Sequence, residues 1–201
     1  MNFQDLRTKI LKYPIFTDDD VLKWFTEEKL PSLQVQLSRW VEKKMLIRLR
    51  KGVYLLAEGE IRDRFVIAPL LYKPSYISLE TALNSFGIIP DIPEAITCVA
   101  INKTSQFKTK FGFFIYRQIK KELFFGYDKV SRTPFSYFIA RPEKAVLDYL
   151  YLKSRGIYPK SLWEIRFAID KNFNWKRFSD YAGYFKNSKK LIKKFIEIYK
   201  K

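Results

Sequence analysis

The sequence predicts an α+β fold with two parts: a small N-terminal domain over residues 1–58 and a mixed α/β C-terminal domain over residues 59–201 that ends in helices. Apolar residues recur at helical spacing in three short N-terminal segments. The stretch IRLRKGVYLL at 47–56 then alternates and turns at a glycine, as a β-hairpin does. Beyond it, runs rich in Ile, Val, Phe and Tyr predict strands, and Lys-rich amphipathic segments close the chain.

The first two helices are predicted from periodicity and from their ends. Residues 3–12 place their apolar side chains on one face, and Pro14 ends that helix. Thr17 or Asp18 caps the next helix, whose acidic residues 18–20 suit the positive end of the helix dipole. A metal site at these aspartates is the weaker interpretation, because no further ligand is near in the sequence.

Pro31 and Ser32 open a third helix, with Ser32 as its expected cap. Its apolar positions share one face and leave polar residues on the opposite face and flanks. After this helix, alternation directs Ile47 and Leu49 inward and Arg48 and Arg50 outward. A tight turn at Gly52 then returns the chain as a second strand.

Three helices followed by a basic hairpin are the order of a winged helix-turn-helix, a DNA-binding domain. The third helix would enter the major groove of double-stranded DNA, where Gln and Arg can read adenine and guanine edges, and the hairpin would reach phosphates. The predicted DNA-binding residues are Ser32, Gln34, Gln36, Ser38, Arg39, Lys43, Arg48, Arg50 and Lys51.

The second domain begins near Gly59. We expect a helix over 61–73, a helix in SLETALNSFG with Ser75 or Ser78 as its cap and Gly87 as its stop, and a helix opened by Pro142. The predicted strands cover 95–101, 111–119, 122–127 and 135–140. Residues 161–201 read as helices, and the last of these is basic and amphipathic. Such a helix can lie on an anionic membrane, but packing against the core is the favoured interpretation.

Composition excludes several classes of protein. The chain has 47% hydrophobic and 17% aromatic residues, which is ample for a packed core. No apolar run approaches the ~18 residues that a membrane span needs, and the N-terminal segment MNFQDLRTKI lacks the apolar region of a secretory signal. Cys98 is the single cysteine, so no intrachain disulfide can form and a cytoplasmic location is expected.

The charged residues favour binding over catalysis. The chain has no histidine, which removes the commonest general base and metal ligand, so we assign no catalytic, cofactor-binding or metal-binding residue. The net charge of +17 favours a polyanionic partner. It is concentrated toward the C-terminus, since residues 143–201 carry 15 basic and 6 acidic side chains.

Three stretches, IRLRKGVYLL, YISLETALNSFGII and RPEKAVLDYLYL, occur in an order and at a separation that resemble the AbiEi antitoxins of type IV toxin–antitoxin systems. The resemblance spans roughly residues 5–155. It implies a winged helix-turn-helix that binds inverted repeats in the promoter of its own operon and represses it. It also implies a C-terminal domain that opposes a nucleotidyltransferase-like toxin, in some members without a stable complex. In this family, which acts in phage defence, segments like 76–83 and 142–148 belong to the C-terminal domain.

Two alternatives stay open beside a DNA-binding repressor. The basic C-terminal domain can instead bind an acidic toxin directly, with the N-terminal domain secondary. A metal-dependent nuclease using Glu80, Glu143 and Asp148 is the weakest interpretation, because the surrounding PEKAVLD sequence reads as core.

Overall fold

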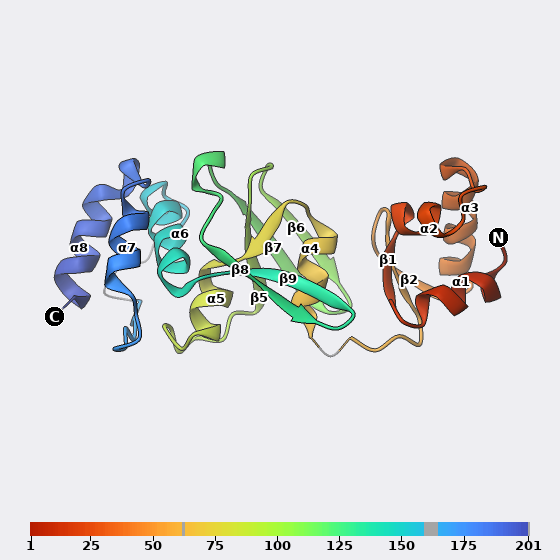
Figure 1. Ribbon diagram of the computed structural model, residues 1–201, viewed down its shortest axis with the longest axis horizontal. Coiled ribbons are helices and arrows are strands. Elements are labelled where there is room, and N and C mark those ends of the chain that lie inside the picture. The colour runs from red at the N-terminus through yellow and green to blue at the C-terminus, as the bar shows by residue number, and fades with distance from the viewer. Residues whose placement is uncertain (62, 159–164, 201) are drawn as a thin grey trace.

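A computed structural model describes residues 1–201 except 62, 159–164 and 201. The molecule is elongated (Figure 1). An N-terminal unit of helices and a small sheet lies at one end, a larger sheet occupies the middle, and a group of helices lies at the other end. The predicted α+β class is confirmed.

The N-terminal unit has three helices and three strands, in the order helix, strand, helix, helix, strand, strand. The second helix begins as predicted, because the Thr17 hydroxyl accepts from the Asp20 amide and the Asp20 carboxylate accepts from the Thr17 amide, which makes a capping box. The elements are α1 (Phe3–Ile10), β1 (Ile15–Thr17), α2 (Asp18–Trp24), α3 (Leu30–Glu42), β2 (Leu46–Arg50) and β3 (Val53–Leu56).

The start of α3 differs from the prediction. The helix begins at Leu30 with Lys29 in the capping position, and no side chain caps it. Pro31 sits in the first turn, where its missing amide hydrogen costs nothing. Ser32 therefore lies inside the helix, and its hydroxyl donates to the Lys29 carbonyl oxygen over 2.9 Å. The assignment of Ser32 as the cap was wrong.

The small sheet has the strand order β1-β3-β2 and is antiparallel throughout. One face packs on the three helices through residues such as Phe16, Leu46 and Tyr54. The other face, with Leu49 and Leu55, joins the apolar cluster of the larger unit. Both faces of the hairpin β2–β3 are therefore covered, and the two units share an apolar contact.

Glycine is required at the turn between β2 and β3. Gly52 has a φ of +77°, which side chains other than glycine rarely adopt. A Cβ atom at Gly52 would also lie 3.3 Å from the Asp18 Oδ2 atom, and the Gly52 carbonyl accepts from the Asp18 amide. The turn is thus fixed against the first residue of α2.

The larger unit is built on a mixed six-stranded sheet with the order β6-β7-β5-β4-β9-β8. Adjacent pairs are antiparallel except β5–β7 and β4–β9, which are parallel. Strands β6 and β8 form its two edges. The strands are β4 (Ser75–Ile77), β5 (Ala95–Ala100), β6 (Ser105–Thr109), β7 (Gly112–Gln118), β8 (Tyr127–Arg132) and β9 (Phe135–Ala140).

The strand predictions were partly right. Three of the four predicted runs are strands, but 122–127 is mostly a 3₁₀ turn and loop, with its last residue opening β8. Four strands were not predicted. β1 and β4 are only three residues long, and the edge strands β6 and β8 contain only one and two apolar residues. The predicted helix over 61–73 is a short 3₁₀ turn followed by one helical turn, η1 (Arg64–Ile67) and α4 (Ala68–Leu71).

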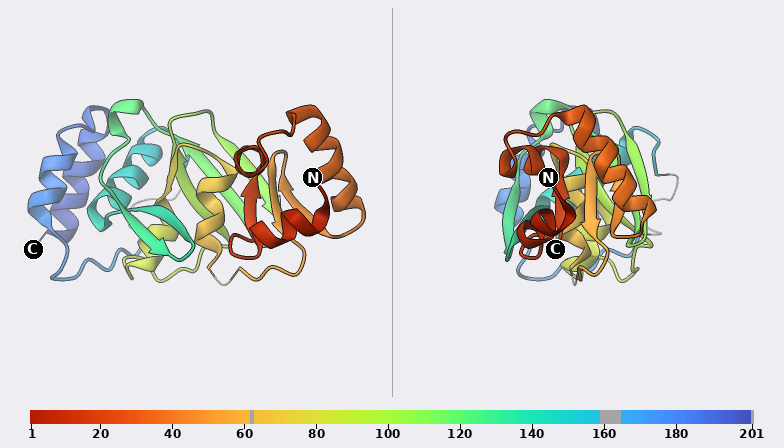
Figure 2. Two further views of the ribbon diagram at one scale, coloured as in Figure 1. Left: turned by 45° about the vertical axis from the view of Figure 1, so that its right-hand side comes forward. Right: turned by 90° about the vertical axis from the view of Figure 1, so that its right-hand side faces the viewer.

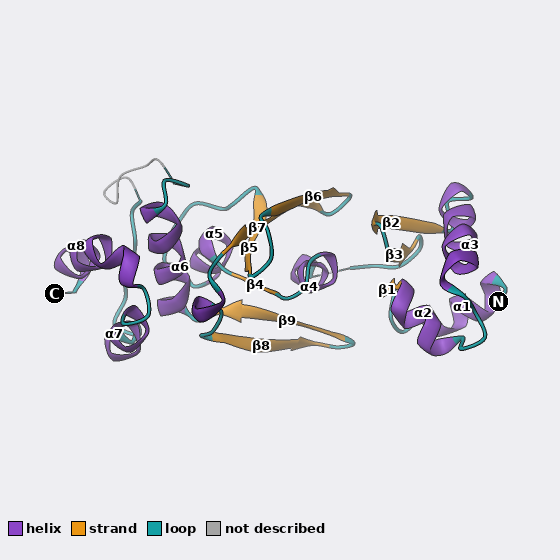
Figure 3. Cartoon of the chain, turned by 90° about the horizontal axis from the view of Figure 1, so that it is seen from above, coloured by secondary structure: helices purple, strands orange, loops and turns teal. Residues whose placement is uncertain are grey.

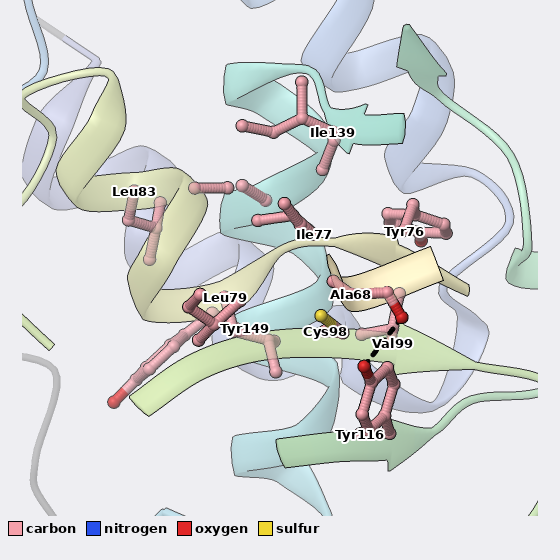
Figure 4. Close-up of a cluster of buried hydrophobic side chains, with 14 of the residues drawn as sticks. Ala68, Tyr76, Ile77, Leu79, Leu83, Cys98, Val99, Tyr116, Ile139 and Tyr149 are labelled. Atoms are coloured by element: carbon pink, nitrogen blue, oxygen red, sulfur yellow. Dashed lines mark hydrogen bonds between the residues drawn. The ribbon is translucent and has the colours of Figure 1, made fainter. Parts of the chain in front are cut away.

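The core of this unit lies on both sides of the sheet. The cluster in Figure 4 includes Ile77, Cys98 and Ile139 from three neighbouring strands, with Leu83 from a covering helix. Tyr116 of β7 pairs with Cys98, and its hydroxyl donates to the Ala68 carbonyl over 2.7 Å. This bond satisfies a buried phenol and fixes α4 against the sheet.

The helices that complete the unit are α5 (Leu79–Ser85), α6 (Pro142–Ser154), η2 (Lys121–Leu123), α7 (Trp175–Ala182), η3 (Lys186–Ser188) and α8 (Lys189–Tyr199). Helix α6 contacts α5 on one side and the α7–α8 pair on the other (Figure 1), and it is buried on nearly every face. The amphipathic last helix packs through Ile192 and Phe195, as expected. In the part of the chain that the structure describes, no helix is long and apolar enough to cross a membrane.

Candidate nucleic-acid interface

The exposed side of α3 presents a narrow mixed surface. Its outward positions, spaced by three or four residues, are Ser32, Val35, Arg39 and Glu42. Val35 is 53% exposed. It is absent from the predicted DNA-binding residues because only polar and charged side chains were considered as base contacts. Ser38 is half-buried on the flank of this surface. A serine, a valine and an arginine on one helix face can contact a base edge, a thymine methyl group and a guanine edge.

Two predicted base-reading residues are engaged inside the protein. The Gln34 side-chain amide donates to the Asp18 Oδ2 atom over 3.0 Å and ties α3 to α2. The Gln36 amide donates to the Met1 carbonyl oxygen over 2.6 Å and holds the N-terminus. Both side chains are half-buried. Their donors would have to leave these partners before they could read a base, so their observed contacts are structural.

The basic side chains of the β2–β3 hairpin point in two different directions. Arg48 pairs across the sheet with Tyr54 on the helix side, and Lys51 lies at the turn, with both side chains exposed. A register shift between residues 48 and 50 changes the direction of Arg50, and its guanidinium lies 5.9 Å from the centre of the Phe107 ring in β6. The turn lies beside the larger unit, since the ends of β2 and β6 face each other in Figure 3.

The remaining cations of this surface are exposed. Among the residues that the structure describes, no ion pair involves Arg39, Lys43, Arg48 or Lys51. Lys43 follows the last turn of α3 and is exposed. These four side chains are therefore available to an external anion.

A buried carboxylate lies beneath the hairpin. Asp18 is 8% exposed; its Oδ2 atom accepts from Gln34, while its Oδ1 atom has no hydrogen-bond partner among the described residues. Burial, with a smaller effect from the Asp18 charge, raises the pKa of Tyr54 above its usual range. Asp18 thus links α2, α3 and the hairpin turn and sets their relative positions.

A second concentration of polar groups lies deep in the larger unit and is closed to solvent. Asp148 accepts from Tyr76 over 2.9 Å and from Ser78 over 2.8 Å, and it pairs with Lys144. The Lys144 ammonium also donates to the Tyr76 hydroxyl over 2.6 Å. Burial lowers the pKa of Lys144 and raises the pKa of Asp148, although the partner opposes each shift.

Aromatic rings enclose the buried ammonium. The Lys144 nitrogen lies 5.2 Å from the ring centre of Tyr76, 5.4 Å from that of Phe125 and 5.3 Å from that of Phe185. Because both charged side chains have no exposed surface, a substrate cannot reach them. Ser78, predicted as a cap of α5, precedes that helix but directs its hydroxyl to Asp148 instead. This network joins β4 to α6.

The three carboxylates of the nuclease interpretation do not form a common site. Asp148 belongs to the buried network, whereas Glu143 accepts from the Asn174 amide and from Arg177. Glu80 raises the pKa of Tyr158, after the larger effect of burial. Within the described residues, no group of acidic or cysteine side chains is arranged to hold a metal ion.

Comparison with known proteins gives no family. No family model matches the chain, and no curated protein matches it.

Proposed function

We propose that the chain is a sequence-specific DNA-binding protein whose N-terminal unit is a winged helix-turn-helix. The order α1-β1-α2-α3-β2-β3, closed by a sheet of order β1-β3-β2, supports this proposal. In such domains the helix before the hairpin enters the major groove. Here that helix is α3, which is exposed along one side and is followed by the exposed cations Lys43, Arg48 and Lys51.

The proposed DNA contacts are of two kinds, contacts to base edges and contacts to phosphates. Arg39, Ser32 and Val35 lie outward on α3 and are the proposed base contacts, with Ser38 on their flank. Lys43, Arg48 and Lys51 are the proposed phosphate ligands. Arg50 contributes charge from its position on Phe107, and the two glutamines position α3 rather than read bases.

We further propose that the protein represses its own operon and acts as the antitoxin of a type IV, AbiE-like, system. The resemblance of its three sequence stretches to AbiEi antitoxins supports this assignment. Its operator would be inverted repeats upstream of its own reading frame, and its cognate toxin would be a nucleotidyltransferase-like protein. A nucleotidyltransferase-type reading frame directly downstream is expected.

The salt dependence of DNA binding tests the proposal. Wild type should protect a segment of its own upstream region in a footprint. The double variant Arg48→Gln, Lys51→Gln should bind more weakly, and the slope of log affinity against log salt should flatten by up to about 1.8, because each lost phosphate contact removes ~0.9. The loss should be the same on operator and unrelated DNA.

A matched control removes the same charge elsewhere. Lys189 and Lys190 are exposed at the start of α8, at the opposite end of the molecule from the hairpin (Figure 1). The variant Lys189→Gln, Lys190→Gln should retain the wild-type slope. If both double variants flatten the slope equally while remaining folded, binding follows total charge and the interface is wrong.

A second candidate function is direct binding of an acidic protein partner by the larger unit. A cavity of about 560 Å³ favours it, since three aromatic residues and two lysines are among the residues that line it. The cavity is lined by Lys120, Glu122, Leu123, Tyr151, Gly183, Tyr184, Phe185, Lys186 and Asn187. Calorimetry with the product of the neighbouring gene decides: a stoichiometric complex that weakens in Lys120→Gln, Lys186→Gln supports this function, and no heat of binding refutes it.

A further inference from the structure

The hairpin of β6 and β7 lies in a stretch of the chain whose charged residues are all basic. Between Glu94 and Glu122 the chain has no acidic residue. The same stretch has six basic residues: Lys103, Lys108, Lys110, Arg117, Lys120 and Lys121. The hairpin therefore adds positive potential with no internal compensation along its own length.

This hairpin is held beside the β2–β3 turn. Arg50 lies over the Phe107 ring of β6, and β2 contacts β6. The turn between β6 and β7 is held from another side, because the Arg64 guanidinium donates to the Phe111 carbonyl over 3.3 Å. The position of the β6–β7 turn relative to the β2–β3 turn is thus fixed by contacts on both sides.

The two hairpins also share a side of the molecule with α3. In Figure 3, β2, α3 and β6 lie along one side, with α1, α2, β8 and β9 toward the other. In the right-hand view of Figure 2, along the long axis, α3 and the light-green strands β6 and β7 again lie on the same side. A straight duplex placed on α3 and extended along the long axis would pass the β6–β7 hairpin.

The lysines of this hairpin are exposed and held in place by aromatic rings. Alternation along β6 directs Phe107 into the core and Lys108 outward. The Lys108 ammonium lies 5.4 Å from the ring centre of Phe113, its cross-strand partner, and the Lys110 ammonium lies 5.0 Å from that of Phe111. No ion pair involves either lysine within the described part of the chain.

We propose that the β6–β7 hairpin is a second phosphate-binding element, in which Lys108 and Lys110 contact the duplex backbone beside the segment read by α3. This inference rests on the proposed function and names a further part of the same DNA interface. Since the contact is with phosphates, it adds affinity without sequence preference. It also requires duplex beyond the segment that the N-terminal unit covers.

Duplex length separates this contact from those of the N-terminal unit. The variant Lys108→Gln, Lys110→Gln is compared with wild type on an operator duplex and on duplexes shortened stepwise from each end. On the full duplex, the salt slope of the variant should be smaller by up to about 1.8, because two phosphate contacts are lost. Shortening the duplex from one particular end should remove the phosphates that the hairpin contacts. The salt slope of wild type should then fall to that of the variant, and the affinities of the two proteins should become equal.

The controls keep the inference separable from the proposed function. The Lys189→Gln, Lys190→Gln variant should match wild type at every length, and circular dichroism should show that both variants are folded. If wild type and the Arg48→Gln, Lys51→Gln variant behave as proposed but the hairpin variant equals wild type at all lengths and salts, this inference alone fails. If wild type binds no duplex in a salt-dependent way, both fail.

Discussion

Lys144 and Lys51 show how differently one side-chain type is used in the two units. Lys144 is fully buried, paired with Asp148 and surrounded by three aromatic rings. Lys51 is exposed at a turn and has no carboxylate partner among the described residues. A charge withdrawn from water can only serve the fold, whereas a charge left in water without a partner can serve an external anion. Stability and DNA binding should therefore respond to different substitutions.

The largest expected effect comes from breaking the buried pair. Lys144→Met should lower the free energy of unfolding by about 3–5 kcal/mol, because it leaves the Asp148 carboxylate buried without a counter-charge. Urea titration followed by fluorescence measures this. The double variant Lys144→Met, Asp148→Leu should recover much of the loss, since two apolar side chains can fill the same space. A loss below about 1 kcal/mol in the single variant would show that the pair is not needed.

The pH dependence of that variant gives an independent test. Burial already raises the pKa of Asp148 in the wild type, and removing Lys144 takes away the largest opposing effect. The folded variant should then hold a proton that the unfolded chain releases above about pH 3.9. Its stability is fully present below that pH and falls as the pH rises through the raised pKa. The difference from wild type should therefore be larger at pH 8 than at pH 5, and a constant difference would contradict a buried, uncompensated carboxylate.

A proposed base-contacting residue on the exposed side of α3 should affect DNA binding and leave the stability of the fold nearly unchanged. Arg39→Ala should weaken operator binding by about 1–3 kcal/mol and relax preference at one or two base pairs. Its free energy of unfolding should stay within about 0.5 kcal/mol of wild type, because the side chain is exposed. Competition between operator and single-base variants measures the preference. A uniform loss on all sequences would make Arg39 a phosphate ligand.

The smallest effect is expected at the start of α2. Thr17→Ala removes one half of the capping box and should cost about 1 kcal/mol of stability. Thr17→Ser retains the hydroxyl and should stay close to wild type. Neither variant should change the salt slope of DNA binding, because neither alters charge. A changed slope with intact stability would place the N-terminus of α2 in the interface.

Local rules predicted the three N-terminal helices and the hairpin but missed the short strands β1 and β4 and the sheet edges. The capping box, the glycine turn and the three helices follow from neighbouring residues, which interact whatever the rest of the chain does. The edge strand β6 reads as SQFKT, whose single apolar residue, Phe107, gave no periodic signal. Its charge did carry a signal, since the stretch without acidic residues around Lys108 and Lys110 is visible in the sequence.

The candidate site was predicted in its composition but not in its contacts. The sequence selected nine residues, and the structure leaves Arg39, Lys43, Arg48 and Lys51 exposed and without carboxylate partners among the described residues. Helical periodicity placed Gln34 on a flank, but its partner on α2 depends on how two helices cross. That angle is set by packing between distant residues, which no local pattern encodes.

By itself, the sequence determined the α+β class, the three N-terminal helices with the hairpin after them, the turn at Gly52 and the excess of positive charge. These follow from side-chain periodicity, backbone conformational limits and composition. Only the tertiary structure decided that Arg50 rests on Phe107, that the hairpin is covered on both faces, and that Lys144 is an internal charge. The physical reason is that burial and pairing depend on segments far apart in the chain, such as β4 and α6, which meet only when the whole molecule has folded.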